Sequence, residues 1–475
     1  MSSTAMSSPP APTPSLYFNK LNIIIFLTYV TSAASVAAPV VLISSIASDL
    51  HSPSESESSF SAKVAGYATL GTSLGKALMG FVGDSMGARR TMILSFLCMA
   101  GGLVLYSLGD TALSIGMANA VIEYFNSVHW PCSAIILATH YKNDPEGLEA
   151  GIFLLSLSSR FGAVTSMPLI ALINSWLGWR KTAFYSAGFS ILGLLSAIFM
   201  VEDAPQKRNE PQGKLLTLTS VVKSLKAVLG NKIWWLVAGA QIGNGMIRTS
   251  ERVVGSFYSE TGGVSDDSAG SLTVVVSIGF LFSVLIFGSM FTKMGNKNKV
   301  RFVSIMYLGS ILCVLGLGFL SLPFVSSSIY LEVALTFGMT SLMGVQYYQV
   351  PTMLASTFGE NKGLCSSYID GVAYASTSIL WSGLSWVVKQ GDYGWLYGWS
   401  SVAFTVVCSM ILCNKFCNKF WAVDGKGNPA QYSKLGGQDE DDDDMRGTEY
   451  HDVVGDDDEE NRRSFSPDTF TTKNV

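Results

Sequence analysis

Long apolar stretches alternate with short polar connections along most of this chain. Each apolar stretch approaches or exceeds the ~20 residues that a helix needs to cross a hydrocarbon core of about 30 Å. We therefore predict an all-α membrane protein with twelve transmembrane helices, at residues 21–46, 62–83, 91–109, 112–140, 149–175, 181–201, 232–258, 268–292, 300–322, 326–356, 362–388 and 394–417.

One polar connection, between the sixth and seventh stretches, is longer than the others and divides the chain into two halves. It contains five basic residues. The chain start is rich in serine and proline and lacks a charged start followed by a short apolar core, so we expect no signal peptide. The predicted parts are a disordered cytoplasmic N-terminus (1–20), an N-terminal six-helix bundle (21–201), a cytoplasmic linker (202–231), a C-terminal six-helix bundle (232–420) and a disordered acidic cytoplasmic tail (421–475).

Short motifs recur in the two halves in the same order. The recurring pairs are Gly80-x-x-x-Asp84-x-x-Gly87 with Gly288-x-x-x-Thr292-x-x-Gly295, Gly71 with Gly279, Pro131 with Pro351, and Gly178-Trp179 with Gly394-Trp395. The repeats predict two pseudo-symmetric six-helix bundles. Two such bundles facing each other would bind a solute at their interface near the bilayer midplane and open alternately to each side.

Composition agrees with a membrane protein and separates the tail from the rest of the chain. Hydrophobic residues make up 48% of the chain and charged residues 14%, which is typical of a chain dissolved in lipid. The tail from Asp424 onward holds 15 acidic and 6 basic residues, whereas the rest holds 20 and 25. A tail of this composition cannot bury apolar surface, so we predict that it is disordered and solubilising or regulatory.

The basic residues of the loops predict the orientation of the chain. If both termini are cytoplasmic, the bases of the linker and of most other connections face the cytoplasm. Four bases would then face outward: Lys63, Arg180, Lys181 and Lys389. Because cytoplasmic loops carry an excess of Lys and Arg, we predict an integral multi-pass protein with both termini cytoplasmic.

The connection after the second predicted span carries a compact motif that we interpret as a gate. Gly80 and Gly87 let helices approach and the chain turn, and Asp84 is placed to accept from a neighbouring helix N-terminus. Arg89 and Arg90 are placed to anchor the turn on the cytoplasmic side.

Charged residues inside the predicted spans are the candidates for binding chemistry. A lysine or arginine at the bilayer centre costs about 2.5–3.5 kcal/mol on insertion scales, so such residues usually face a polar cavity. The bases are Lys76, Arg160, Arg248 and Arg252, the acids are Glu123, Glu251, Glu332 and Asp370, and His129 lies near Glu123 in the same span.

These charges allow three interpretations. Basic groups from both halves that converge on one cavity would bind an anion, which favours Lys76, Arg160 and Arg248 as substrate-binding residues. Alternatively, each base pairs with a buried acid to hold the helices together, as Arg252 with the adjacent Glu251, or Arg160 with Glu123.

The third interpretation assigns proton coupling to three titratable residues. Glu123 and His129 both titrate near neutrality when their surroundings shift them, and Asp370 is a further carrier within a span.

The turn motif and the repeated halves resemble the major facilitator superfamily across about residues 20–420. Within it, the chain resembles the organophosphate:phosphate antiporters, the group of the glycerol-3-phosphate transporters and the endoplasmic-reticulum sugar-phosphate exchangers. The residues that carry this second resemblance are Gly75-Lys76, Met79-Gly80, Asp84, Trp130-Pro131-Cys132, and Arg248 ten residues before Tyr258.

The second resemblance implies roles for individual residues. It implies that Arg248 binds a phosphoryl group with Lys76 nearby, and that Arg160 stands where those transporters carry a histidine near the substrate. The first span departs from the family, because it offers Thr31, Ser32, Ser35 and no base where bacterial members supply a second phosphate-binding arginine. Either Arg160 replaces that charge or the ligand is not a phosphate ester.

We therefore predict a secondary transporter of a small organic anion that works by alternating access, with phosphate-ester exchange as the leading substrate hypothesis. The alternatives are proton-coupled transport of a carboxylate or another small solute, and a non-transporting solute receptor that signals through its acidic tail. We expect a monomer in the lipid bilayer without cofactor, metal or nucleic acid. An enzyme is not expected, because no nucleophile, base and orienting residue occur together and the four histidines are scattered.

Overall fold

The computed structural model of the protein describes residues 19–51, 56–142, 144–201, 226, 228–355, 362–388 and 393–420. The chain divides into two units, Met1–Gly436 and Gly437–Val475, and every described residue belongs to the first. The predicted tail at 421–475 and most of the predicted N-terminal segment and linker lie outside the described residues.

Helices form nearly all of the described chain before the linker. They are α2 (Lys20–Leu50), α3 (Glu57–Met86), α4 (Ala88–Leu108), α5 (Ala112–Asn126), α6 (His129–His140), α7 (Pro145–Leu177) and α8 (Trp179–Phe199). We call these the first group. The predicted span at 112–140 is made of two helices, because α5 ends before Ser127 and α6 begins at His129.

The second group follows the linker and contains more breaks. Its elements are α10 (Lys232–Thr249), the 3₁₀ turn η1 (Ser250–Arg252), α11 (Val254–Gly262), α12 (Asp266–Leu272), α13 (Val274–Phe282), the π-helical segment η2 (Ser283–Gly288), α14 (Ser289–Lys293), α15 (Asn296–Leu320), α16 (Ile329–Ala355), α17 (Lys362–Val388) and α18 (Gly394–Phe420). Each predicted span of this half thus corresponds to one helix or to a run of consecutive elements, and the predicted all-α class is confirmed.

Seven helical stretches of the described chain are long and apolar enough to cross a membrane by themselves. They are Lys20–Leu50, Ala88–Leu108, Glu146–Leu177, Trp179–Phe199, Asp266–Phe291, Lys297–Leu320 and Gly394–Lys419. The other five predicted spans are α5 with α6, α10 with α11, and the helices α3, α16 and α17. Most of these carry the intramembrane charges Lys76, Glu123, Arg248 and Asp370, which lower their apolar character. The fold has twelve spans in two pseudo-symmetric six-helix bundles.

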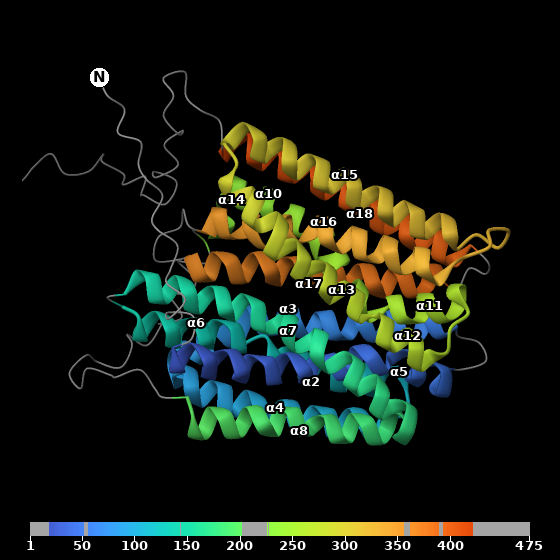
Figure 1. Cartoon of the computed structure of the whole chain (residues 1–475), viewed down its shortest axis with the longest axis horizontal. Coiled ribbons are helices and arrows are strands. Elements are labelled where there is room, and N and C mark those ends of the chain that lie inside the picture. Colours follow the sequence, from blue (N-terminus) through green and yellow to red (C-terminus); the bar gives the residue numbers. More distant parts are fainter. Residues whose placement is uncertain are drawn as a thin grey trace, which may run out of the picture. The chain divides into compact units, whose positions relative to one another are not determined.

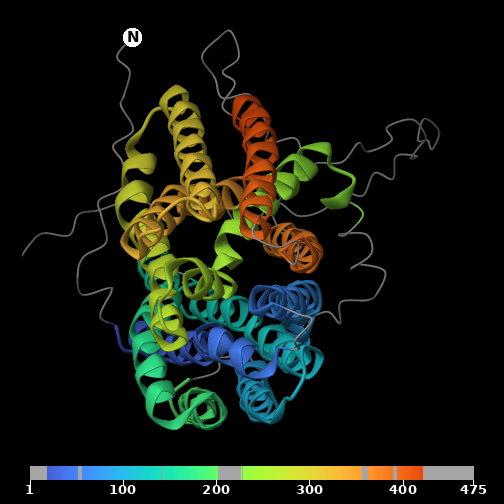
Figure 2. The same cartoon turned by 90° about the vertical axis from the view of Figure 1, so that its right-hand side faces the viewer.

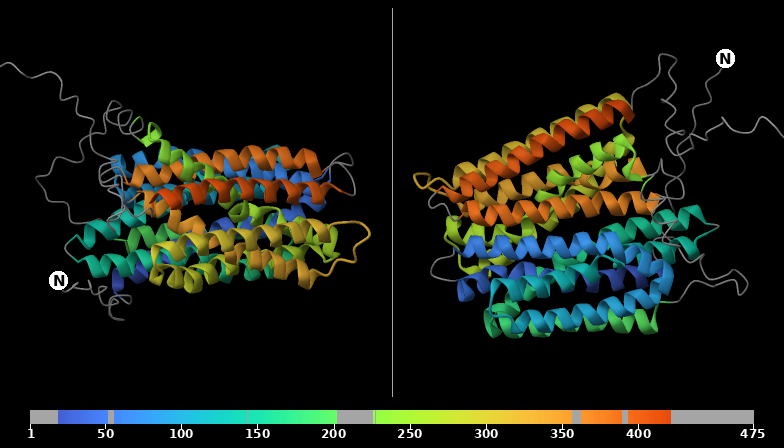
Figure 3. Two further views of the ribbon diagram at one scale, coloured as in Figure 1. Left: turned by 90° about the horizontal axis from the view of Figure 1, so that it is seen from above. Right: turned by 180° about the vertical axis from the view of Figure 1, so that it is seen from behind.

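The two groups lie against each other with their helices running roughly along one axis (Figures 1 and 3). Viewed along that axis, the first group occupies the lower part of Figure 2 and the second group the upper part. The most extensive contact between the groups is made by α3 with α17, and α12 also packs against α2 and α7. We call the end where α2 finishes and α3 begins the distal end.

Several hydrogen bonds join the two groups at the distal end. Glu260 on α11 accepts from the backbone N–H of Ser58 of the first group at 2.8 Å, and Trp395 Nε1 of its own group also donates to it, at 2.6 Å. Asp267 on α12 accepts from the side-chain amide of Asn174 on α7. Backbone and side-chain donors of the first group are thus held by carboxylates of the second.

The glycine pair Gly71 and Gly279 serves the same purpose in both groups. A Cβ added to Gly71 on α3 would overlap the Ala120 carbonyl of α5, and one added to Gly279 on α13 would overlap the Thr340 hydroxyl of α16. Each glycine therefore permits a close approach of two helices. The sequence repeat is matched by equivalent packing.

Replacing Gly71 with alanine is expected to lower the thermal unfolding midpoint of the detergent-purified protein. Overpacking of this kind costs about 1–3 kcal/mol, because the Ala120 backbone cannot move aside as a flexible side chain would. Gly101→Ala on α4 is the matched control, since nothing lies within 4 Å of its added Cβ. Equal midpoints for the two variants would show that the helices are not closely packed at Gly71.

The predicted gate motif forms the turn between α3 and α4. Gly87 has a φ of 86°, which an L side chain rarely adopts. Arg89 donates from Nε to the Ala197 carbonyl at 3.1 Å and from Nη2 to the Ile198 carbonyl at 2.6 Å, so it anchors the turn to the C-terminal end of α8. The surroundings of Gly80 and of the Asp84 side chain are not described, Arg90 is exposed, and the gating role of the five residues stays a prediction.

Candidate functional site

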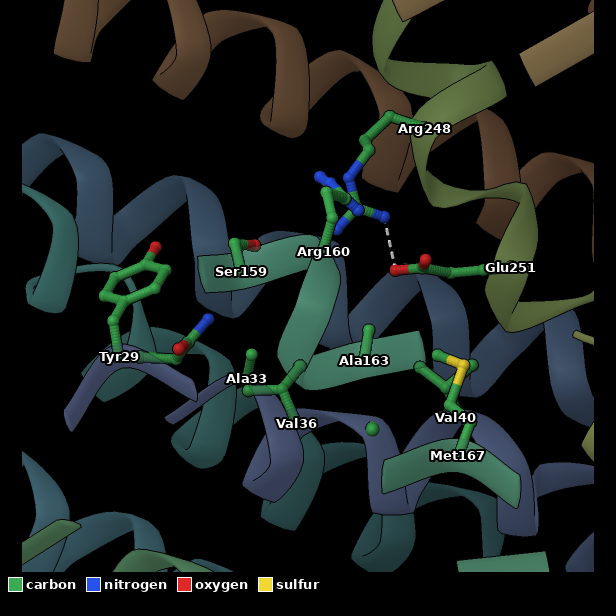
Figure 4. Close-up of a pocket in the computed structure, with 12 residues that line it drawn as sticks. Tyr29, Ala33, Val36, Val40, Ser159, Arg160, Ala163, Met167, Arg248 and Glu251 are labelled. Carbon is green, nitrogen blue, oxygen red and sulfur yellow. Dashed lines mark ion pairs between the residues drawn. The ribbon is translucent and has the colours of Figure 1, made fainter. Parts of the chain in front are cut away.

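A cavity of about 50 Å³ lies between the two groups (Figure 4). Its lining comes from α2 and α7 of the first group and from α10 and η1 of the second, with Asn126 of α5. Pockets that enclose a drug-sized ligand measure about 300–1,000 Å³. The cavity therefore fits only a small solute before side chains move.

The lining has a charged side and an apolar side. Arg160, Arg248 and Glu251 supply the charges. The apolar side chains are Ala33, Val36, Ala37, Val40, Ala163 and Met167. Tyr29, Asn126 and Ser159 are the uncharged polar members. A solute with a charged end and an apolar body matches this division.

Arg160 is buried on α7 and is held by a neutral partner. Its Nε and Nη2 donate to the Tyr348 hydroxyl of α16 at 2.9 and 2.7 Å. Its guanidinium carbon also lies 5.3 Å from the centre of the Phe280 ring. Arg160 thus crosses from the first group to the second without meeting a carboxylate in these contacts.

Arg248 approaches the same aromatic ring from the second group. Its guanidinium carbon is 5.8 Å from the Phe280 ring centre, and Nη1 forms an ion pair with Glu251 Oε1. Figure 4 shows Arg160 and Arg248 on the same side of the cavity, with Glu251 ion-paired to Arg248. Glu251 Oε2 is buried without a hydrogen-bond partner among the described residues. The Arg248–Glu251 pair therefore forms a charged wall that retains an unused acceptor.

Lys76 lies near this cavity but does not line it. Its Nζ is 3.4 Å from Asp370 Oδ2, which joins α3 to α17. Tyr29, which does line the cavity, lies near both Lys76 and Arg160. Two of the three predicted substrate-binding residues thus line one cavity, and the third lies in the adjoining polar region.

A second buried ion pair links the groups through Arg252 and Glu123. Arg252 Nη2 binds Glu123 Oε1 of α5, whose Oε2 accepts from Thr72 Oγ1 of α3 at 3.1 Å. Nε and Nη1 of Arg252 have no hydrogen-bond partner among the described residues.

This arrangement corrects two predicted pairs. Glu251 pairs with Arg248 rather than with the adjacent Arg252, because residues three apart share a helix face and adjacent residues do not. Glu123 pairs with Arg252 rather than with Arg160.

The three candidates for proton coupling occupy different surroundings. His129 is buried within the first group, where its Nε2 lies 2.8 Å from Ser95 Oγ and its ring centre 4.2 Å from that of Phe96. Glu123 and Asp370 are ion-paired as described above. None of the three lines the cavity, and their proton-coupling role stays a prediction.

Sequence reasoning missed Tyr348, Phe280 and the cavity position of Glu251. Tyr347 and Tyr348 form a polar aromatic pair within α16, and Tyr347 donates to or accepts from the Tyr374 hydroxyl at 2.9 Å. Two adjacent tyrosines inside an apolar span are the sequence signal that indicates this polar surface.

Comparison with known proteins gives the same fold. A sequence profile of the Major Facilitator Superfamily matches residues 25–382. The crystal structure of a point mutant of the nucleoside transporter NupG has a TM-score of 0.63 and 15% sequence identity, and the match covers 84% of this chain and 99% of that one. The crystal structure of a D-xylose-proton symporter has a TM-score of 0.62 and 16% sequence identity, and the match covers 85% of this chain and 98% of that one. At these identities the two structures show similarity of fold alone.

Proposed function

The chain belongs to the major facilitator superfamily, and from this premise we propose that it transports a small organic anion. Transporters of this superfamily bind their solute between two helical halves near the bilayer midplane and expose it alternately to each side. The protein is thus an integral multi-pass membrane protein that performs secondary transport.

The observation that carries the anion proposal is that each half contributes an arginine to one cavity. Arg160 comes from the first group and Arg248 from the second, and both guanidinium groups face Phe280. The planar fork of a guanidinium matches a carboxylate or phosphate bidentately. Arg160 has a hydroxyl as its partner, which an anionic oxygen can replace at a gain in electrostatic energy.

Phosphate-ester exchange is one form of this proposal. It is supported by the resemblance to organophosphate:phosphate antiporters and by the position of Arg248 in the cavity. The carboxylates of Glu251 and Asp370 act against it, because they already engage Arg248 and Lys76. A carboxylate substrate is therefore tested beside the phosphates.

Uptake into proteoliposomes tests the proposal. The panel consists of inorganic phosphate, glycerol 3-phosphate, butanoate and butanedioate as anions, with xylose and uridine as neutral solutes. We expect saturable uptake, or exchange against the same internal solute, for at least one anion, and loss of that flux in Arg248→Ala. The exposed Arg301 provides the control variant Arg301→Ala, which is expected to keep the flux.

Uptake of neutral solutes alone, with Arg248→Ala as active as the wild type, would contradict the proposal. Wild type and Arg248→Ala are first compared by thermal unfolding, so that a loss of flux is not confused with a loss of fold.

A further inference from the structure

The charges around the cavity do not balance. Among the described residues, four bases and three acids meet in this region: Lys76, Arg160, Arg248, Arg252, Glu123, Glu251 and Asp370. Three ion pairs use all the acids, and the base that remains is Arg160, whose partner Tyr348 is neutral. The region therefore carries one surplus positive charge.

We propose that the site selects an organic anion with one negative charge and an apolar body, such as a monocarboxylate, and that it accepts a divalent anion only together with one proton. This inference rests on the proposed function and specifies its substrate class. Unbalanced charge is costly in a buried site, because the surroundings cannot solvate it as water does. One negative charge neutralises Arg160 and leaves the three ion pairs intact.

A divalent anion would bring one negative charge too many. The two arginines would bind it together, and Glu251 would then lose Arg248 as its partner while remaining buried. A proton taken from the water on the open side would bind Glu251 at Oε2, which has no hydrogen-bond partner among the described residues, or would bind the anion itself. Arg160 and Arg248 then supply two positive charges, and the anion and Glu251 together supply two negative charges after one proton has been taken up.

The charged groups around Glu251 determine how much a second negative charge in the cavity would cost. The charged groups that act on Glu251 are Arg248 on α10, Arg160 on α7 and Arg252 on η1. Tyr29 on α2 lines the same cavity. Arg252 and Lys76 are already neutralised by Glu123 and Asp370.

Six of the nine remaining lining residues are apolar, and they specify the body of the solute. Ala33, Val36, Val40, Ala163 and Met167 present carbon atoms, whereas a sugar phosphate would bring several hydroxyl groups that need partners. A buried hydroxyl without a hydrogen bond is unfavourable. An apolar chain or ring attached to one carboxylate satisfies the charged and the apolar sides together.

Calorimetric titration of the purified protein in buffers of different ionisation enthalpy tests the inference, because it counts the protons taken up on binding. The probes are butanoate with butanedioate, hexanoate with hexanedioate, 3-phenylpropanoate with phenylbutanedioate, and glycerol 3-phosphate. For wild type we expect the tightest monocarboxylate to bind without proton uptake and equally well at pH 6.5 and 8. We expect each dicarboxylate to bind more weakly, with about one proton taken up and about tenfold weaker binding per pH unit.

Glu251→Gln supplies the decisive comparison. It raises the surplus to two positive charges, so we expect dicarboxylates to bind without proton uptake and the mono-to-dicarboxylate affinity ratio to fall by about tenfold or more. Glu251→Asp keeps the charge and is expected to keep the wild-type ratio. Asp110→Asn removes an exposed acid at the protein surface and is the control for total charge.

Two results would overturn the inference: wild type that binds divalent anions more tightly than monovalent ones without proton uptake, or Glu251→Gln that weakens both classes equally. The second result would assign Glu251 a structural role only. Failure of the proposed function is different, since no anion of either class would then bind or be taken up and a neutral solute would be transported instead.

Discussion

Replacing Arg160 with glutamine is expected to reduce anion uptake at low solute concentration by about 100-fold or more. Removing one partner of a buried, hydrogen-bonded charge pair costs about 2–5 kcal/mol, and Arg160 is the base in the cavity region that is not already neutralised by an acid. Initial rates of labelled anion uptake into proteoliposomes measure the effect.

A conservative variant separates charge from geometry at this position. Arg160→Lys retains the charge but loses the fork that donates through Nε and Nη2, so we expect uptake between those of wild type and Arg160→Gln. Arg301→Gln on the exposed face of α15 is expected to transport normally. Wild-type uptake by correctly folded Arg160→Gln would remove Arg160 from the binding site.

Replacing Arg252 with glutamine is expected to lower the free energy of unfolding more than the other substitutions proposed for this protein. Glu123 would remain buried without its ion-pair partner, and breaking a buried pair on one side costs about 3–5 kcal/mol. The loss is measured as a lower thermal or denaturant unfolding midpoint of the purified protein.

The double variant Arg252→Gln with Glu123→Gln tests whether these residues act as a pair. It is expected to be more stable than either single variant, since neither charge is then left alone. Single substitutions in the exposed Arg180–Asp110 pair are the control, with an ion-pair contribution of about 0–1 kcal/mol. Additive losses in the Arg252 and Glu123 variants would show that the pair does not couple the helices.

The apolar pattern was sufficient to predict the order of the spans, because the length of each stretch reflects the thickness of the bilayer. It did not predict the interruptions at Ser127, at η1 and at η2. A local change from α-helix to a turn, a 3₁₀ segment or a π segment leaves the flanking helices apolar. The periodicity therefore contains no information about it.

The sequence predicted the basic residues of the candidate site but not the acids with which they pair. Arg160 and Arg248 were identified because a charge inside an apolar stretch is visible in sequence. Arg252 and Glu123 are 129 residues apart and meet only through the packing of the two groups. Tyr348 was not predicted, because the adjacent pair Tyr347-Tyr348 indicates a polar surface in sequence but does not reveal that one hydroxyl binds an arginine.

The bond between Glu260 and the Ser58 N–H has a consequence for the transport cycle. The first turn of α3 receives this acceptor from the opposite half, whereas Ser56 Oγ in the same segment accepts from the Ser59 N–H. When the halves separate at the distal end, Ser58 loses its foreign acceptor and Ser59 keeps its local one. The deuterium exchange rate of the Ser58 amide therefore rises relative to that of the Ser59 amide when the distal end opens. The ratio of the two rates reports which side of the molecule is open.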